Sequence, residues 1–101
     1  MSATTDRPAE QTLDGEWKVI RTGGLLPPFL GLVHKRIAGS SGRTTAAGIG
    51  VPFDVVGLEL HYRAPFRGVV DRLEPDGPES YAGTTLVSGR RIGSFRLERI
   101  R

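Results

Sequence analysis

The sequence of 101 residues contains no cysteine, which excludes disulfide bonds and thiolate metal sites. It also lacks any apolar run near the roughly 18 residues that a membrane-spanning helix needs. Residues 1–5 do not have the apolar stretch of a signal peptide. We therefore expect a soluble cytoplasmic protein without a membrane span.

Lysine is scarce, because Lys18 and Lys35 stand beside 12 arginines, and the net charge is only +3. Guanidinium groups suit phosphate or carboxylate recognition. Here, however, the arginines are spread along the chain among 11 acidic residues. This pattern favours a bias of the genome towards arginine, and we do not expect a nucleic-acid partner.

Glycine and proline are frequent, with 14 and 7 residues, which is typical of short strands joined by tight turns. Apolar and polar residues alternate with a period of two between turn signals. Strands are predicted over 16–22, 32–38, 43–56, 58–64, 69–73, 79–87 and 91–100. A bulge or sharp bend suggested by Gly48, Gly50 and Pro52 would split the third of these into two short strands. The sequence thus predicts an all-β domain over 13–101, a small antiparallel up-and-down β-barrel of seven or eight short strands. Residues 1–12 are predicted to form a flexible or short-helical arm.

The alternation also predicts which side chains share a face. Asp71 shares a face with Val69 and Leu73, so it is a buried acid–base group or the ion-pair partner of Arg72 or Arg91, unless the strand is twisted there. His34 and His61 fall on polar faces, and their spacing matches no metal motif, so no metal site is expected. The residues predicted on apolar faces are Trp17, Val33, Lys35, Ile37, Thr45, Ile49, Phe53, Leu58, Leu60, Tyr62, Ala64, Tyr81, Phe95 and Leu97.

The segment Gly15-Glu16-Trp17, on the first predicted strand, resembles the Gly-x-Trp motif of the calycin superfamily, whose best-known members are the lipocalins. In that family the tryptophan closes the narrow end of an up-and-down barrel, and an arginine of the last strand packs on it. The resemblance implies that Trp17 closes the barrel beneath Arg99, which is preferred to Arg96. The chain is far shorter than a secreted lipocalin. No histidine follows His61 to serve as the late haem ligand of haem-binding calycins, so no cofactor is expected.

A binding protein for a small hydrophobic ligand, such as a fatty acid or a polyketide-like acid, is the function that the sequence favours. The apolar segment 25–30 is predicted to pack on the barrel, as part of its core, as a lid or as a homodimer contact. Tyrosine hydroxyls and one guanidinium would orient the polar end of the ligand. The predicted ligand-binding residues are Arg21, Leu26, Phe29, Phe53, Leu60, Tyr62 and Tyr81.

Two alternatives remain open at this point. One is a small-molecule enzyme on the same barrel (an isomerase, cyclase or decarboxylase) that uses Tyr62, Tyr81, Asp71 and Arg21. The other is a filled barrel that acts through its surface on a protein or a nucleic acid. A homodimer contact through segment 25–30 is compatible with each of them.

Overall fold

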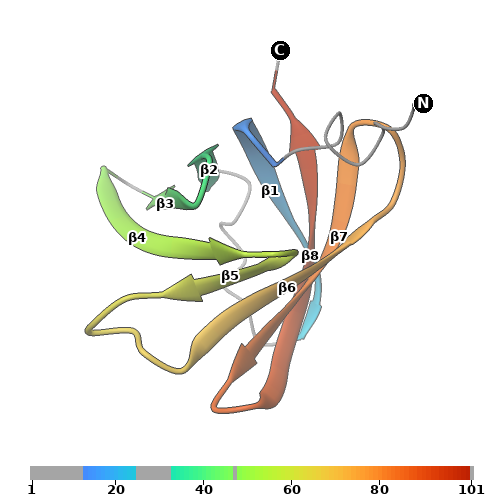
Figure 1. The fold of residues 1–101 in the computed structure, drawn as a ribbon. Helices are drawn as coiled ribbons and strands as arrows, with labels where there is room; N and C mark the ends of the chain where they lie inside the picture. Colours follow the sequence, from blue (N-terminus) through green and yellow to red (C-terminus); the bar gives the residue numbers. More distant parts are fainter. Residues whose placement is uncertain (1–12, 25–32, 47, 101) are drawn as a thin grey trace, which may run out of the picture.

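A computed structural model describes residues 13–24, 33–46 and 48–100 of the chain. These residues form eight antiparallel strands that close into one barrel, as the alternation of apolar and polar residues predicts. Each strand pairs with its neighbours in the sequence, and the last pairs with the first from Trp17–Arg99 to Gly24–Gly93. The strands are β1 (Gly15–Gly24), β2 (His34–Ala38), β3 (Ser41–Ala46), β4 (Ile49–Val56), β5 (Glu59–Tyr62), β6 (Val69–Pro75), β7 (Ser80–Val87) and β8 (Arg90–Arg99) (Figure 1).

The up-and-down topology gives the barrel two different ends. The β2–β3, β4–β5 and β6–β7 turns lie with the end of β8 at one end, which we call the closed end. The β3–β4, β5–β6 and β7–β8 connections lie with the end of β1 at the other, which we call the open end. In Figure 1 the β5–β6 and β7–β8 connections lie far from the end of β8.

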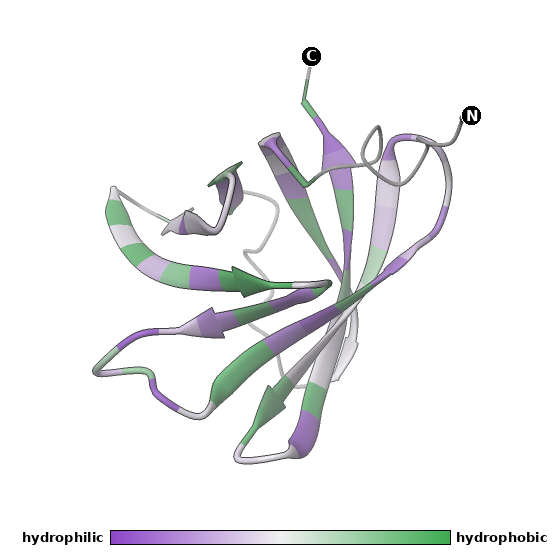
Figure 2. Cartoon of the chain, viewed as in Figure 1, coloured by the Kyte–Doolittle hydropathy of each residue, from purple (hydrophilic) through white to green (hydrophobic). Residues whose placement is uncertain are grey.

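The core fills the closed half of the barrel. Trp17, Phe53, Leu60 and Leu97 have no exposed surface, and polar residues alternate with apolar ones along β4 and β8 (Figure 2). Two inward-facing glycines make room for aromatic rings. A Cβ atom at Gly83 would overlap the Phe95 ring, and a Cβ atom at Gly42 would lie 2.6 Å from the ring of Phe53.

The structure corrects the predicted faces at several strand ends. A turn that includes Gly48 separates β3 from β4, and the register pairs Lys35 with Thr44 rather than Thr45. Thr44 therefore points inward and Thr45 is exposed. The prediction was wrong here because it assumed that inward and outward residues keep alternating without a break from β3 through the turn into β4. Leu58 and Ala64 are exposed because β5 is shorter than predicted and ends before both are enclosed. Ile49 is also exposed, beside the turn.

Candidate binding site inside the barrel

Trp17 forms the floor of the barrel at the closed end. Its indole Nε1 donates a hydrogen bond of 2.8 Å to the carbonyl of Leu13, and the Tyr81 ring meets it edge-on with centroids 5.4 Å apart. The guanidinium carbon of Arg99 lies 4.2 Å from the centre of the indole ring. Such a cation–π contact contributes about 0.5–2 kcal/mol. Arg96, the other candidate for this position, is exposed on the outer face.

A buried ion pair crosses the interior above this floor. Lys35 lies on β2 and Asp71 on β6, four strands apart in the ring of eight, so the two side chains meet across the barrel. The Lys35 Nζ lies 3.0 Å from Asp71 Oδ2, and each residue is only 3% exposed. The ammonium group also lies 5.4–5.6 Å from the ring centres of Phe53, Tyr62 and Phe95.

Three hydroxyl groups complete the polar network around the pair. Lys35 Nζ donates to Thr44 Oγ1 at 2.8 Å, to Tyr62 Oη at 2.7 Å and to Asp71. Tyr62 donates to Asp71 Oδ2 at 2.9 Å, and Thr85 donates to Asp71 Oδ1 at 2.8 Å. Thr44 and Tyr62 lie 2.7 Å apart, so Thr44 is the donor once the proton of Tyr62 is used on Asp71. Every polar hydrogen of the network then has an acceptor.

The electrostatics of the network favour a charged Lys35. Burial alone would lower the pKa of Lys35, but the attraction of the Asp71 carboxylate, aided by Tyr62, outweighs it and holds the pKa above its usual value. Burial raises the pKa of the Tyr62 hydroxyl, and the nearby Lys35 cation offsets part of that increase. At neutral pH the interior therefore holds an ammonium group and a neutral tyrosine.

A cavity of about 150 Å³ adjoins this network. Lys35, Thr44, Tyr62, Asp71 and Thr85 form its polar side. Its remaining walls are apolar and come from β1, β6, β8 and the residue that precedes β2. These residues are Val19, Val33, Val69 and Phe95. The cavity thus combines an apolar wall with one polar cluster, the arrangement usual for small-molecule sites.

The structure brings together only some of the residues predicted to bind a ligand. Tyr62 lines the cavity, while Phe53 and Leu60 are fully buried in the core and do not line it. Tyr81 packs against Trp17 at the closed end instead of facing the cavity. Arg21 is exposed next to a register shift at the end of β1, where it donates to the Gly24 carbonyl at 3.3 Å.

Leu26 and Phe29 lie outside the described residues, as does the rest of the predicted lid over 25–30 and the predicted arm over 1–12. The segment that contains Leu26 and Phe29 joins Gly24 to Val33 in the sequence. The roles predicted for these residues stay predictions.

Sequence reasoning missed the partners of Asp71. The alternation placed Lys35 between Val33 and Ile37, so a charged residue on an apolar face was the available signal. It did not predict that Lys35 meets Asp71, because the two strands are not neighbours in the barrel. Thr85 lies between Gly83 and Val87 on one face of β7 and gave no comparable signal.

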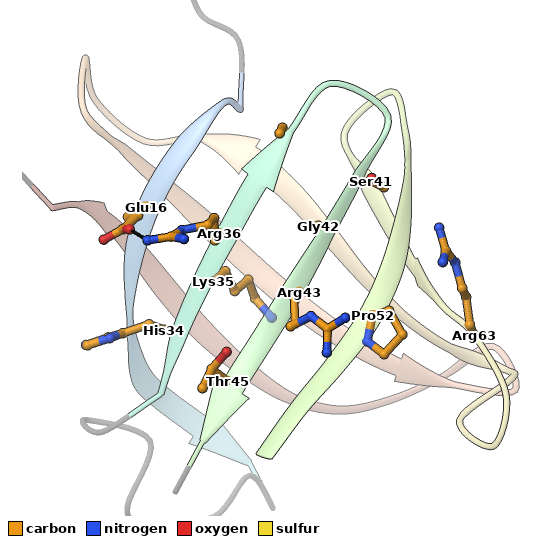
Figure 3. A pocket seen from close by; sticks show the side chains of 11 residues that line it. Glu16, His34, Lys35, Arg36, Ser41, Gly42, Arg43, Thr45, Pro52 and Arg63 are labelled. Carbon is orange, nitrogen blue, oxygen red and sulfur yellow. Dashed lines mark hydrogen bonds and ion pairs between the residues drawn. The ribbon is translucent and has the colours of Figure 1, made fainter. Parts of the chain in front are cut away.

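A second hollow of about 630 Å³ lies on the outer surface over β2, β3 and β4 (Figure 3). Arg36 in it forms an ion pair with Glu16, and Arg63 pairs with Asp54 at 2.6 Å. Gly50 and Pro52 have no long side chains beside Arg43, which explains why the surface is hollow there. The described residues contain no cluster of three metal-ligating side chains.

Comparison with protein-family models, with curated proteins and with solved structures gives no match for this chain. The eight-stranded antiparallel barrel is compatible with a calycin-like fold. Among the described residues, no helix is long and apolar enough to cross a membrane.

Proposed function

We propose that the protein binds a small, uncharged molecule with an apolar body and one hydrogen-bond-donating group. The observation that carries this proposal is the cavity beside the Lys35–Asp71 network. A barrel of eight strands has an interior just wide enough for side chains or for one small ligand. The cavity provides that space, with apolar walls for the body of the ligand.

The polar side of the cavity favours a ligand that donates a hydrogen bond. The protons of Lys35, Tyr62, Thr44 and Thr85 all have acceptors within the network, whereas Asp71 Oδ1 receives one described hydrogen bond, from Thr85. A carboxylate oxygen can accept more than one hydrogen bond. An alcohol, a phenol or an amide can therefore bind without breaking the network.

Charge and size argue for the same class of ligand. Lys35 and Asp71 neutralise each other, so a carboxylate buried beside them would have no counter-charge. Arg21, predicted to bind a carboxylate, is exposed and does not line the cavity. A cavity of about 150 Å³ is of the size that holds a benzene-sized molecule. These points favour a compact neutral ligand over a long fatty acid.

Three aromatic probes test the proposal by two-dimensional amide NMR. Phenol carries a ring and a donor, toluene carries the ring alone, and benzoate carries the ring and a negative charge. We expect phenol to shift the amide signals of Val19, Val33, Val69 and Thr85 and to bind more tightly than toluene or benzoate. The proposal is overturned if no probe shifts these signals, or if benzoate binds best.

A variant that fills the cavity provides the control. Val69→Phe places a ring in the cavity wall, whereas Val56→Phe changes an exposed residue at the closed end that does not line it. We expect the first to abolish phenol binding and the second to leave it unchanged. Native mass spectrometry of freshly purified protein would then show any molecule that co-purifies with the chain.

Two further predictions concern assembly and catalysis. The expected homodimer contact involves Leu26 and Phe29, which lie outside the described residues. Size-exclusion chromatography of a Leu26→Asp/Phe29→Asp variant tests it, because loss of the contact would delay elution. For the enzymatic alternative, Tyr62 and Asp71 are the two proposed catalytic residues that lie within hydrogen-bonding distance of each other.

A further inference from the structure

The open end of the barrel has a one-sided charge distribution. Among the described residues, its turns and strand ends contain no acidic side chain over 21–24, 33–34, 44–46, 48–50, 62–70 and 84–95. The same stretches contain five arginines. These are Arg21, Arg63, Arg67, Arg90 and Arg91. Asp71, the acid closest to this end in the strand register, is buried in its ion pair with Lys35.

Three of these arginines have no ion pair with any described residue. Arg67, Arg90 and Arg91 are exposed, whereas Arg63 pairs with Asp54. The loops that carry them touch each other, because Ser88 donates a backbone hydrogen bond of 2.9 Å to the carbonyl of Gly68. The β5–β6 and β7–β8 connections therefore lie side by side at the open end, and the surface that they form carries Arg67, Arg90 and Arg91.

Exposed apolar side chains lie at the same end of the barrel. Phe66 is 46% exposed in the β5–β6 connection, and Val87 is 36% exposed at the end of β7. Ile49, beside the β3–β4 turn at the same end, is 68% exposed. The start of β6 and the end of β7 are correspondingly hydrophobic in Figure 2. We name Phe66, Arg67, Val87, Arg90 and Arg91 the basic rim.

The closed end provides an internal comparison. It also exposes apolar side chains, at Val56, Leu58 and Ile100. Its arginines, however, are matched by acids: Arg72 pairs with Glu59 at 3.1 Å, and Arg99 pairs with Glu79 at 3.2 Å. The difference between the two ends is therefore their charge rather than their apolar exposure.

We propose that the basic rim docks the open end of the barrel on the surface of an anionic lipid bilayer. Apolar tips among unpaired arginines fit such a surface, because the tips enter the boundary between headgroups and acyl chains while guanidinium groups bind lipid phosphates. The absence of acidic groups from the described stretches of this end avoids repulsion from the same lipids. This inference does not depend on what the interior cavity binds.

Two other occupants fit the rim less well. A second copy of the chain joined through the same end would bring Arg67, Arg90 and Arg91 against their own copies. Single-stranded nucleic acid would be held by a basic groove with aromatic side chains on which bases stack. Phe66 is the one aromatic residue of the rim, so the rim lacks a row of stacking platforms.

Co-sedimentation of the full chain with lipid vesicles tests the proposal. We expect binding to phosphatidylcholine vesicles that contain about 30 mol% phosphatidylserine, little binding to pure phosphatidylcholine, and a decrease as salt is raised. Neutralising one interfacial arginine weakens binding about fivefold, so Arg67→Gln/Arg90→Gln should lose about 25-fold. Phe66→Ala should lose about tenfold through its apolar surface.

Matched variants separate docking from a general effect of charge. Lys18→Gln/Arg43→Gln removes two exposed cations outside the rim and should change binding less than about threefold. Leu58→Ala removes an exposed apolar side chain at the closed end and should leave binding unchanged. The proposal is overturned if phosphatidylserine vesicles do not bind, or if the two double variants lose affinity equally. It is also overturned if the rim binds a single-stranded oligonucleotide but not the vesicles.

Discussion

The buried ion pair makes a sharp prediction about stability. In Lys35→Met the apolar side chain has similar length, but the Asp71 carboxylate keeps only its hydrogen bonds from Tyr62 and Thr85 and loses its counter-charge. Removing one partner of a buried pair costs about 3–5 kcal/mol. Asp71→Asn leaves the Lys35 ammonium without a carboxylate in the same enclosed site, and we expect a loss of similar size.

The double variant should be more stable than either single one. In Lys35→Met/Asp71→Asn no charge remains buried, and the carbonyl oxygen of the new side-chain amide can still accept from one of the two hydroxyls, since Tyr62 and Thr85 donate to different oxygens of Asp71. What remains is an amide N–H group without a partner, which costs about 1–3 kcal/mol. Combining the changes should therefore restore part of the stability that each change removes, so that their effects are strongly non-additive.

Urea unfolding followed by Trp17 fluorescence measures these effects, because the only tryptophan is fully buried in the folded state. The free energy of unfolding of a domain is about 5–15 kcal/mol, so a variant with one of these substitutions can be partly unfolded even in the absence of urea. Its midpoint is then measured in a stabilising osmolyte, against wild type in the same solution. Additive losses, or a single loss below about 1 kcal/mol, would refute the reasoning.

Three further predictions follow from the same contacts. Acylation at neutral pH should modify the exposed Lys18 and spare Lys35, which is 3% exposed, until urea unfolds the chain. Mass spectrometry of proteolytic peptides measures the modification of each lysine, and equal modification of the two in the folded protein would contradict the burial of Lys35. The pKa values of Lys35 and Tyr62 are higher in the folded protein than in the unfolded chain, where they lie near 10. Both groups therefore stabilise the fold fully while the pH is below about 10, and this stabilisation is lost as the pH rises through their folded-state pKa values. Titration of these two groups should thus leave the urea midpoint unchanged between about pH 7 and 9 and lower it above about pH 10. The decrease should be smaller in Lys35→Met/Asp71→Asn, which lacks the lysine. Arg99→Gln should cost about 0.5–2 kcal/mol, whereas the outward-facing Arg96→Gln should cost less than about 0.5 kcal/mol; the reverse order would contradict the Trp17 contact.

The architecture was predictable because it depends on local patterns. Alternation within strands and glycine-rich turns between them were sufficient to predict an all-β barrel. The Gly-x-Trp motif led to Trp17 and Arg99, which the structure places in contact. Strand ends were harder to predict, because the break in alternation at the turn that includes Gly48 decides whether Thr44 or Thr45 points inward.

The site was less predictable because its contacts are not local. Tyr62 and Tyr81 both stand on apolar faces, yet one joins the Lys35 network and the other packs on Trp17. Their heights along the barrel depend on the lengths of β5 and β7 and on the register between strands. Asp71 was recognised as a candidate buried acid, but a pair formed across four strands leaves no spacing signal in the sequence.

Because the ion pair lies beside the cavity, a small amine should be able to replace the lysine side chain. Lys35→Ala removes the ammonium group and the three carbons beyond Cβ, which n-propylammonium reproduces, and leaves the Asp71 carboxylate to bind it. At about ten times its dissociation constant the amine should stabilise this variant by about 1.4 kcal/mol, visible as a higher urea midpoint. 1-Propanol supplies the carbon chain without the charge and should stabilise it less.

The corresponding Lys35→Ala/Asp71→Asn variant lacks the carboxylate and should gain nothing specific from the amine. Equal effects of amine and alcohol on Lys35→Ala would show that the carboxylate does not select the ligand. A response to the amine that disappears with Asp71 would instead show that the network both sets the charge of the interior and accepts a small molecule. That is the property on which the proposed binding function rests.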